Sequence, residues 1–190
     1  MIIAIEGLDS SGKTTQTELL KQYLNNQGYE VETFHFPNKN AMFGSKIYGY
    51  LQGNVDYTPE VIELLHTADK MNMQEYLNEF KNNKQKYLIL DRYALSQYAY
   101  ALANGFDEDW TLNLMKLYIQ PDIKIYLNIT PKESMQRKKE LDKYESDIKF
   151  LTNVGIYYLS GCKQFNYYII DGDDDKFRIH DVIKDLIYAV

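Results

Sequence analysis

The segment Gly7-Leu8-Asp9-Ser10-Ser11-Gly12-Lys13-Thr14 determines the fold that we expect for this chain. It follows an apolar run at residues 2–6, which is typical of a buried strand, and it precedes a helical pattern of apolar residues over 13–26. The pattern G-x-x-x-x-G-K-[ST] between a strand and a helix is the signature of a phosphate-binding loop. The segment therefore predicts a site for a nucleoside triphosphate.

The residue types in this loop indicate how it would hold phosphate. Gly7 and Gly12 allow backbone conformations that turn successive N–H groups inward, and the start of the following helix adds the positive end of its dipole. Lys13 is expected to reach the β- and γ-phosphates, and the Thr14 hydroxyl to face a Mg²⁺ ion. We thus predict a purine nucleoside triphosphate and Mg²⁺ as cofactors, with the nucleotide held by Gly7, Ser10, Ser11, Gly12, Lys13, Thr14 and Thr15.

Asp9 lies inside the loop and needs a separate interpretation. A carboxylate among phosphate-binding N–H groups would repel the triphosphate if it faced it. We therefore expect Asp9 to point away from ATP, toward a second substrate, and to orient it. The alternative is a hydrogen bond that stabilises the loop, because Asp is a common turn residue.

The composition is that of one globular domain, which we expect to span residues 1–190. The chain is 45% hydrophobic and 25% charged, and its formal net charge of −6 argues against a nucleic-acid-binding surface. It begins without a basic segment or a long apolar run, so we expect neither a signal peptide nor a membrane partner. A lone cysteine, Cys162, excludes an internal disulfide, and we expect a cytoplasmic location.

Short apolar runs alternate with helical patterns along the chain. We expect strands at residues 2–6, 31–36, 87–90, 123–127 and 168–170. We expect helices at residues 13–26, 59–82, 94–103, 110–119, 150–162 and 181–189, a short one interrupted by glycines within 41–53, and one opened by the capping box of Thr130 and Glu133. The alternation favours a parallel sheet with helices on both faces, a three-layer α/β fold.

Several segments, in this order along the chain, resemble the thymidylate kinases among the nucleoside monophosphate kinases: Glu6-Gly7-Leu8-Asp9, Phe36-Pro37, Asp91-Arg92-Tyr93, Pro121-Asp122 and Asp142-Lys143-Tyr144-Glu145. The resemblance covers nearly the whole chain, and the Asp-Arg-Tyr and Phe-Pro segments are its most specific parts. It implies a five-stranded parallel sheet, a mobile lid and a homodimer. It also implies transfer of the γ-phosphoryl group of ATP to dTMP, which yields dTDP and ADP.

Asp91 and Arg92 follow a predicted buried strand, so they are expected at the carboxyl edge of the sheet, where open α/β folds bind ligands. Arg92 is one of few arginines in a chain whose basic residues are mostly lysines, and its fork could clamp the acceptor phosphate with two hydrogen bonds. Asp91 could help to hold the Mg²⁺ shell. The alternative for the two residues is a buried structural ion pair.

Arg137 lies in the segment that corresponds to the lid of the family, about residues 136–147. Some family members carry a catalytic arginine in the phosphate loop, where this chain has Ser10 and Ser11, so we expect Arg137 to neutralise charge on the transferring group, with help from Lys138 or Lys139. The alternative is a solvated basic run.

The resemblance also implies residues that surround the acceptor. Phe36, Pro37 and Ser96 fall on the acceptor side, and Tyr144 matches a tyrosine that covers the bound monophosphate. Tyr100 matches an aromatic residue that would crowd a 2′-hydroxyl and so favour deoxyribose. For each tyrosine the alternative is ordinary packing, since the chain has 18 Tyr.

The chain departs from the family where the base should be recognised. His66 and Lys70 stand where relatives carry a stacking aromatic and an arginine that hydrogen-bonds thymine, and His35 replaces a common phosphate-facing arginine. The spacing of His66 and Lys70 puts them on one helix face, but Lys offers a point charge and no fork. We expect dTMP first, with dUMP, dGMP or a broader pyrimidine set open, and ordinary helix-surface residues as the alternative for these two.

Two other functions stay open from the sequence. A deoxynucleoside kinase would share the phosphate loop, but such kinases carry a Glu-Arg-Ser-like segment where this chain has Asp-Arg-Tyr. A nucleotide switch or a non-catalytic binding module is the other alternative. A guanine-specific switch needs an Asn-Lys-x-Asp-like segment after the fourth strand, where this chain has Leu127-Asn128-Ile129-Thr130.

Overall fold

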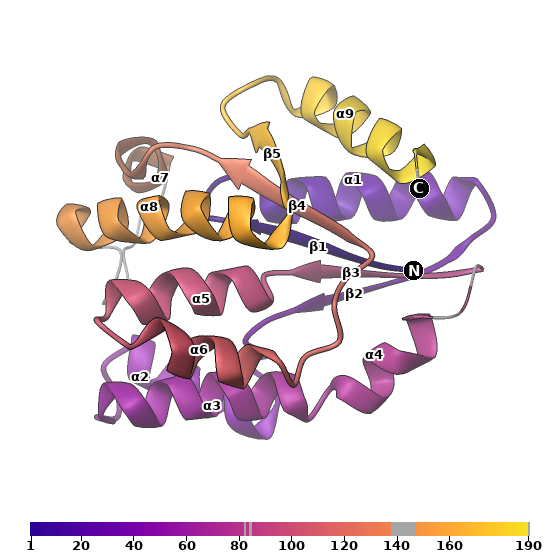
Figure 1. The fold of residues 1–190 in the computed structure, drawn as a ribbon. Coiled ribbons are helices and arrows are strands. Elements are labelled where there is room, and N and C mark those ends of the chain that lie inside the picture. The colour runs from indigo at the N-terminus through magenta and orange to yellow at the C-terminus, as the bar shows by residue number, and fades with distance from the viewer. Residues whose placement is uncertain (82, 84, 138–146, 190) are drawn as a thin grey trace.

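The computed structural model describes residues 1–81, 83, 85–137 and 147–189. Within them, parallel strands form a five-stranded sheet in the order β2-β3-β1-β4-β5 (Figure 1). The strands are β1 (Ile2–Gly7), β2 (Glu30–His35), β3 (Lys86–Asp91), β4 (Ile123–Asn128) and β5 (Tyr168–Asp171). The predicted parallel α/β sheet is confirmed, and each predicted strand lies within two residues of its expected bounds.

Helices cover both faces of this sheet, because successive side chains of the strands point in opposite directions. Ile3 and Ile5 of β1 pack on one side with α1 and α9, whereas Ile2 and Ala4 pack on the other with α4, α5, α6 and α8. The helices are α1 (Lys13–Asn26), α2 (Met42–Leu51), α3 (Pro59–Met71), α4 (Gln74–Lys81), α5 (Ala94–Ala103), α6 (Glu108–Met115), α7 (Pro131–Arg137), α8 (Ile148–Phe165) and α9 (Lys176–Tyr188). Among the described residues, none of these helices is both long and apolar enough to cross a membrane.

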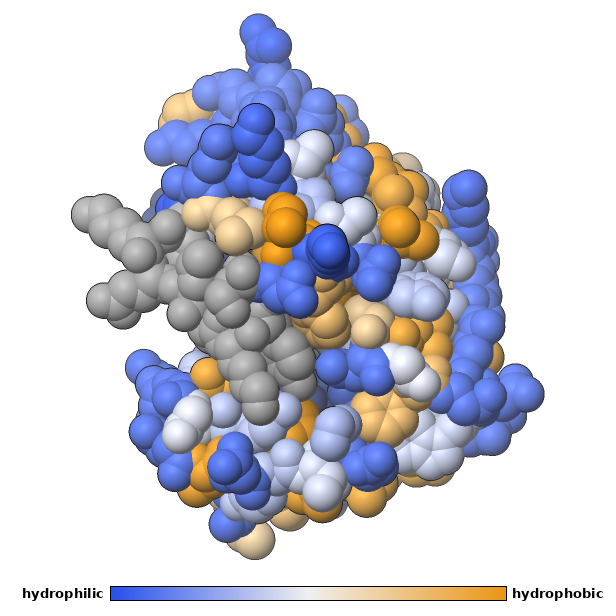
Figure 2. All heavy atoms as spheres, turned by 90° about the vertical axis from the view of Figure 1, so that its left-hand side faces the viewer, coloured by the Kyte–Doolittle hydropathy of each residue, from blue (hydrophilic) through white to orange (hydrophobic). Residues whose placement is uncertain are grey.

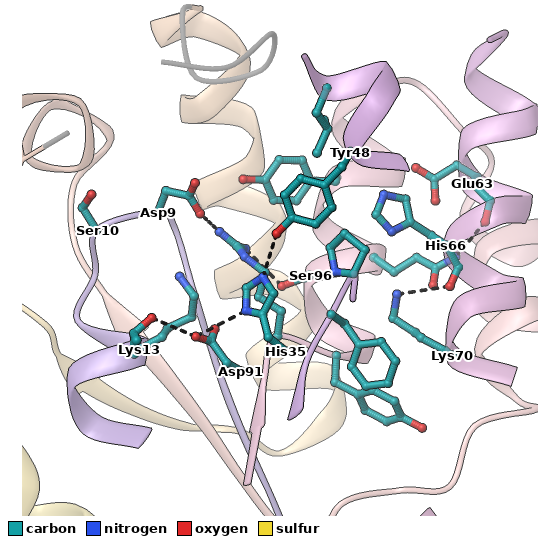
Figure 3. Close-up of a pocket in the computed structure, with 18 residues that line it drawn as sticks. Asp9, Ser10, Lys13, His35, Tyr48, Glu63, His66, Lys70, Asp91 and Ser96 are labelled. Atoms are coloured by element: carbon teal, nitrogen blue, oxygen red, sulfur yellow. Dashed lines mark hydrogen bonds and ion pairs between the residues drawn. The ribbon is translucent and has the colours of Figure 1, made fainter. Parts of the chain in front are cut away.

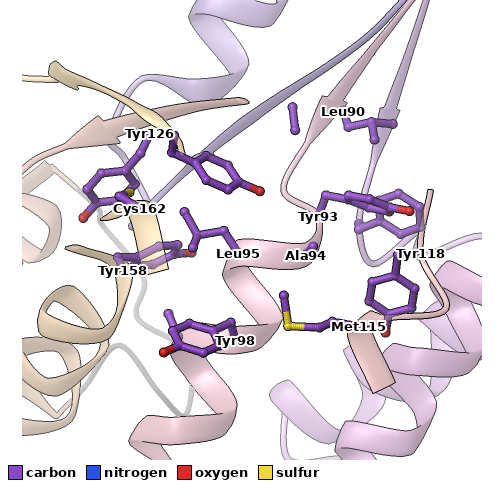
Figure 4. Close-up of a cluster of buried hydrophobic side chains, with 14 of the residues drawn as sticks. Leu90, Tyr93, Ala94, Leu95, Tyr98, Met115, Tyr118, Tyr126, Tyr158 and Cys162 are labelled. Atoms are coloured by element: carbon purple, nitrogen blue, oxygen red, sulfur yellow. The ribbon is translucent and has the colours of Figure 1, made fainter. Parts of the chain in front are cut away.

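The core beneath α5 is rich in tyrosine. Tyr93, Tyr98, Tyr118, Tyr126 and Tyr158 are all almost fully buried there, and Figure 4 shows them around the helix. A buried tyrosine supplies a large apolar ring and a hydroxyl that needs a partner. The Tyr118 hydroxyl donates to Gln97 Oε1 at 2.7 Å, and that of Tyr158 lies 2.8 Å from Ser96 Oγ. The hydroxyls of Tyr118 and Tyr158 thus both contact polar side chains of α5.

Two helix ends follow the local sequence as expected. After α1, the Gly28 N–H donates to Asn25 O at 2.9 Å and the Tyr29 N–H to Leu24 O at 3.2 Å, the pair of bonds that terminates many helices at glycine. Before α7, the capping box is confirmed: Thr130 N donates to Glu133 Oε2 at 2.8 Å and Glu133 N to Thr130 Oγ1 at 3.2 Å.

The long helix predicted over residues 59–82 is wrong, since the structure divides it into α3 and α4. At the break, the Gln74 side chain donates to Lys70 O at 2.7 Å and accepts from Ile119 N at 2.6 Å. The Met73 N–H donates to Lys70 O at 3.1 Å, in a tighter turn than an α-helix makes. The contact of Gln74 with a residue 45 positions away thus redirects the chain.

Three other predicted helices have different bounds. α6 begins earlier than predicted, because Asp107 caps it by accepting from Trp110 N at 2.8 Å, and it ends at Met115, after which Tyr118 enters the core. α9 begins at Lys176 because Asp175 accepts from Phe177 N at 2.9 Å. The helix predicted within 41–53 is not interrupted by its glycines, since α2 is continuous. Gly44 instead allows α2 to pack closely on Asn38, because a Cβ at Gly44 would lie 2.0 Å from Asn38 O.

The register of the strands brings three carboxyl ends together. Asp91 of β3 pairs with Ile5 of β1 on one side and with His35 of β2 on the other. The residues that follow these strands therefore meet at one edge of the sheet. Figure 2 turns this side of the molecule toward the viewer, where hydrophilic residues cover most of the surface and apolar ones lie between them.

Candidate active site

The loop between β1 and α1 has the backbone form that a phosphate-binding loop needs. Gly12 precedes α1 with a φ of 96°, and no side chain of the described residues caps the helix start. A Cβ at Gly7 would lie 2.5 Å from Ser11 Oγ and 2.7 Å from Leu127 O, so only glycine fits there. The N–H groups at the start of α1 thus keep their bonding capacity for an anion.

Lys13 and Thr14 extend from this helix start toward the sheet edge. Lys13 Nζ donates to Leu8 O at 2.7 Å and to Gly7 O at 3.2 Å, which folds its ammonium group over the loop. Thr14 Oγ1 donates to Asp91 Oδ2 at 3.0 Å. A lysine and a hydroxyl thus lie on the phosphate side of the loop, as the sequence predicted.

Asp91 has the environment of a cation ligand. Its Oδ1 is buried and has no hydrogen-bond partner in the part of the chain that the structure describes. Burial raises the pKa of Asp91, but His35, Lys13 and Thr14 more than offset this effect and hold the pKa below its usual value. No group of three or more His, Cys, Asp or Glu that could hold a metal occurs among the described residues. One carboxylate and one hydroxyl fit Mg²⁺, which binds largely through substrate phosphates and water.

Arg92 turns back over the phosphate loop from the end of β3. Its backbone N–H donates to Ile5 O at 3.0 Å, and its φ of 66° is unusual for a residue with a side chain. The guanidinium forms an ion pair with Asp9 and donates to Gly7 O at 3.0 Å. Arg92 and the loop therefore face each other, as the sequence predicted, and Asp9 points toward Arg92.

Glu6 holds the backbone around Arg92, a role that the sequence did not indicate. Its carboxylate is fully buried and accepts from the N–H groups of Tyr93 at 3.0 Å, Leu95 at 2.9 Å and Ser96 at 3.2 Å. It also accepts from Ser96 Oγ at 2.5 Å. Burial raises the pKa of Glu6, opposed by Ser96 and by the charge of Arg92. The only hint in the sequence is a carboxylate at the end of an apolar strand.

A cavity of about 400 Å³ opens beside these groups (Figure 3). Most of the predicted site residues line it, namely Asp9, Ser10, Lys13, Thr14, Phe36, Pro37, His66, Lys70, Asp91, Arg92, Ser96 and Tyr100. Gly7, Ser11, Gly12 and Thr15 belong to the loop and the start of α1 but are not part of the lining. Tyr144, Lys138 and Lys139 lie outside the described residues. The lining also includes Glu63, Gln97, Tyr48 and Leu51, which the sequence analysis did not select.

Tyr100 and His35 line the cavity near Arg92 and Asp91. The Tyr100 ring centroid is 5.9 Å from the Arg92 guanidinium carbon, and the ring contacts that of Tyr158 edge-on at 6.3 Å. His35 Nδ1 is 3.4 Å from Asp91 Oδ2, and its Nε2 is 3.5 Å from the Tyr48 hydroxyl. The cavity extends from an end near Lys13 and Arg92 to a second end near α3.

The second end is formed by one face of α3. Glu63, His66 and Lys70 follow each other at spacings of three and four, which places them on one side of the helix. The alternative that Lys70 is a helix-surface residue is wrong, because it is only 3% exposed. Burial lowers the pKa of Lys70 to about 8 and that of His66 to about 3, so the imidazole is neutral.

Arg137 is the last residue of α7 and does not line the cavity. Its guanidinium donates to Ser10 O at 3.3 Å and Gly172 O at 3.2 Å, and it forms an ion pair with Asp173. It therefore contacts the phosphate loop at Ser10, whereas Arg92 contacts it at Gly7 and Asp9. Most of the predicted lid lies outside the described residues.

A phosphate-binding loop on a parallel sheet, with a cavity beside it at the same sheet edge, defines a P-loop phosphotransferase. Residues 5–183 match the family described as thymidylate kinase, and the chain belongs to the thymidylate kinase family.

Relatives agree with this assignment, and a solved structure shares the fold. The chain is 33% identical to the thymidylate kinase of Schizosaccharomyces pombe, over 100% of this chain and 92% of that one. It is 32% identical to a probable thymidylate kinase of Methanosphaera stadtmanae, over 98% and 97% of the two chains. The structure of a thymidylate kinase from Candida albicans shares the fold, with a TM-score of 0.83 and 24% identity, and covers 99% of this chain and 91% of that one.

Proposed function

We propose that this protein transfers the γ-phosphoryl group of ATP to the 5′-phosphate of dTMP and releases dTDP and ADP. The observation that carries the proposal is that Arg92 and the phosphate loop face each other across the end of β1, joined by the Asp9 ion pair and the bond to Gly7 O. On this proposal, Arg92 binds the acceptor phosphate across from the loop that holds the donor phosphate. Membership of the thymidylate kinase family supports dTMP as the acceptor.

The donor side would hold ATP through the loop amides and Lys13. Lys13 Nζ now rests on the carbonyls of Gly7 and Leu8, and it would exchange these contacts for the β- and γ-phosphate oxygens. Thr14 and the free Oδ1 of Asp91 would hold Mg²⁺, which, when bound, neutralises the charge of the phosphates. His35 and Lys13 keep Asp91 ionised for this purpose.

The acceptor side would fix the monophosphate with Arg92. Ser96 and Glu6 hold Arg92 in place, so that its guanidinium can bind two phosphate oxygens in line with the donor. Tyr100 would face the deoxyribose, and Phe36 and Pro37 would pack on the base. A phosphate acceptor is already ionised near neutral pH, so the reaction needs no general base, and rate acceleration comes from positioning and charge stabilisation.

Arg137 would complete the site from the lid. It already binds the Ser10 carbonyl of the phosphate loop, so a modest movement of its side chain would bring the guanidinium to oxygens of the transferring group. Lid closure over the substrates would exclude water and limit wasteful ATP hydrolysis. We also propose a homodimer in the cytoplasm, on the resemblance to the family and on the composition.

The experiment is an acceptor panel at one concentration of Mg²⁺ and ATP. We expect dTMP to stimulate ADP formation strongly and to yield dTDP, whereas thymidine does not. Turnover of thymidine but not dTMP would instead favour a deoxynucleoside kinase. If no deoxynucleotide or deoxynucleoside changes the rate of ATP consumption, the proposed function is wrong.

A further inference from the structure

Glu63 of α3 places a buried carboxyl group at the end of the cavity away from the phosphate-binding loop. The residue is 3% exposed and lines the cavity, and its Oε2 has no hydrogen-bond partner among the described residues. An unpartnered buried carboxylate destabilises a fold, and most buried polar groups do have partners. Figure 3 shows the Glu63 carboxylate beside His66, on the cavity side of the helix.

The polar neighbours of Glu63 already have partners of their own. Gln97 Nε2 donates to Thr67 Oγ1 at 2.9 Å, and Gln97 Oε1 accepts from the Tyr118 hydroxyl at 2.7 Å. Thr67 Oγ1 in turn donates to the Glu63 main-chain carbonyl at 2.9 Å. Gln97 also acts on the Glu63 carboxyl by a side-chain hydrogen bond that lowers its pKa. Glu63 Oε2 nevertheless has no partner among the described residues, so it can accept from a molecule in the cavity.

Lys70 supplies the complementary donor two helical turns further along α3. Its Nζ makes one long bond, 3.4 Å to His66 O, and lies 5.6 Å from the centroid of the Phe36 ring. The charge of Lys70 opposes the effect of burial on Glu63, whose pKa still rises to about 7. Glu63 and Lys70 therefore line the same cavity from one side of α3, two turns apart. Glu63 Oε2 offers an acceptor without a partner among the described residues, and Lys70 offers a donor with one long bond.

We propose that Glu63 and Lys70 together recognise the edge of the nucleobase: Lys70 donates to a ring carbonyl and Glu63 accepts from the adjacent ring N–H. This inference rests on the proposed function, since it assumes that a nucleoside monophosphate fills the cavity. Thymine, uracil and guanine all carry a ring N–H next to a carbonyl. Cytosine and adenine carry a ring nitrogen lone pair next to an amino group, so they would meet Glu63 with an acceptor and Lys70 with a donor.

The site would thus select bases by the order of donor and acceptor on their edge. Above its pKa of about 7 the Glu63 carboxylate can only accept, so a base with the wrong order leaves the two buried groups without partners. The test below is therefore run at pH 8. Lys70 alone, as a point charge with several donors, could not impose that order. Glu63 is therefore the residue that determines base specificity. It lies one helical turn before His66 and two turns before Lys70, the positions at which the chain departs from its family.

The test compares kcat/KM for dTMP and dCMP, at saturating Mg²⁺ and ATP, in the natural protein and in Glu63→Leu and Glu63→Gln. We expect Glu63→Leu to lower kcat/KM for dTMP about 10- to 100-fold, mainly through KM, and to leave dCMP and the KM for ATP unchanged. Glu63→Gln should lower the dTMP:dCMP ratio severalfold, because its amide can also donate to cytosine. The control is Glu75→Gln, an exposed carboxylate at the start of α4, which should keep the natural ratio.

The outcomes separate this inference from the function on which it rests. An unchanged dTMP:dCMP ratio in a folded Glu63→Leu protein overturns the inference and leaves the kinase function standing. If the leucine variant does not fold, an unchanged ratio in the isosteric Glu63→Gln variant overturns it equally. An equal loss with both nucleotides would assign Glu63 a structural role and also contradict the inference. Absence of turnover with any monophosphate in the natural protein contradicts the proposed function itself.

Discussion

The guanidinium of Arg92 forms an ion pair with the carboxylate of Asp9, which joins the end of β3 to the phosphate loop after β1. This contact holds the Arg92 guanidinium toward the loop. A phosphate has more acceptor oxygens and more charge than one carboxylate, so the acceptor that we propose could compete with Asp9 for the same guanidinium.

Replacement of Arg92 tests its place on the acceptor side. We expect Arg92→Ala to raise KM for dTMP at least about 100-fold, because two charge-assisted hydrogen bonds to the phosphate are lost. Arg92→Lys should recover only part of this loss, since lysine lacks the fork. Steady-state kinetics with each substrate varied in turn provide the measurement. A change in KM for ATP as large as that for dTMP would contradict the assignment.

Replacement of Asp91 tests the cation site. In Asp91→Asn the carboxylate beside Thr14 loses its charge, and we expect the Mg²⁺ concentration for half-maximal rate to rise about tenfold or more. Removal of Mg²⁺ by EDTA should abolish turnover of the natural protein, and added Mg²⁺ should restore it. The Mg²⁺ dependence of the rate is measured at constant free ATP. An unchanged dependence in the variant would mean that Asp91 does not hold the cation.

Replacement of Arg137 tests the lid contribution. We expect Arg137→Ala to lower kcat about 10²- to 10³-fold with little effect on KM for dTMP, because the guanidinium would act on the transferring group. Arg178→Ala is the matched control, since the Arg178 side chain is 77% exposed and forms an ion pair with Asp174. Equal kinetics for the two variants would assign Arg137 to structure alone, through its bonds to Ser10 and Gly172.

The buried carboxyl of Glu63 should make the stability of the fold depend on pH. Its pKa is about 7 in the native state, above the ordinary value of 4.5, so the native state holds the proton more tightly than the unfolded chain. The stabilisation from this group is complete below pH 4.5 and is lost as pH rises to about 7.

Relative to the natural protein, Glu63→Gln should therefore gain about 2 kcal/mol in free energy of unfolding between pH 5 and pH 8. Urea denaturation of both proteins at the two pH values measures this difference. A difference that does not change with pH would show that the carboxyl titrates alike in the folded and unfolded states.

The sequence predicted the phosphate end of the site better than the base end. The motif from Gly7 to Thr14 specifies its own backbone, because glycine and helix-start positions leave few alternatives. Arg92 could be placed because it follows an apolar strand, and parallel strands end at a common edge. These predictions depend on local pattern and on one topological rule.

The base end depends on contacts between distant residues, which no local pattern reveals. The bonds of Gln74 to Lys70 O and from Ile119 N break the predicted helix and fix where α3 ends. The burial of Glu63 follows from packing of α3 on Gln97 and Tyr118, not from its own neighbours in sequence. The sequence likewise indicates only that Glu6 ends an apolar strand, whereas its role depends on hydrogen bonds from residues 93–96, which are distant in sequence.

Neighbouring residues of one strand serve the two halves of the site: Gly7 opens the donor loop, and Glu6 clamps the chain that carries Arg92. The proposed separation of the two phosphates is thus set by strand β1, whereas Glu63 and Lys70, which we propose to recognise the base edge, both lie on α3. Base preference can consequently change through substitutions on one face of α3, while β1 keeps the two phosphate sites in place relative to each other.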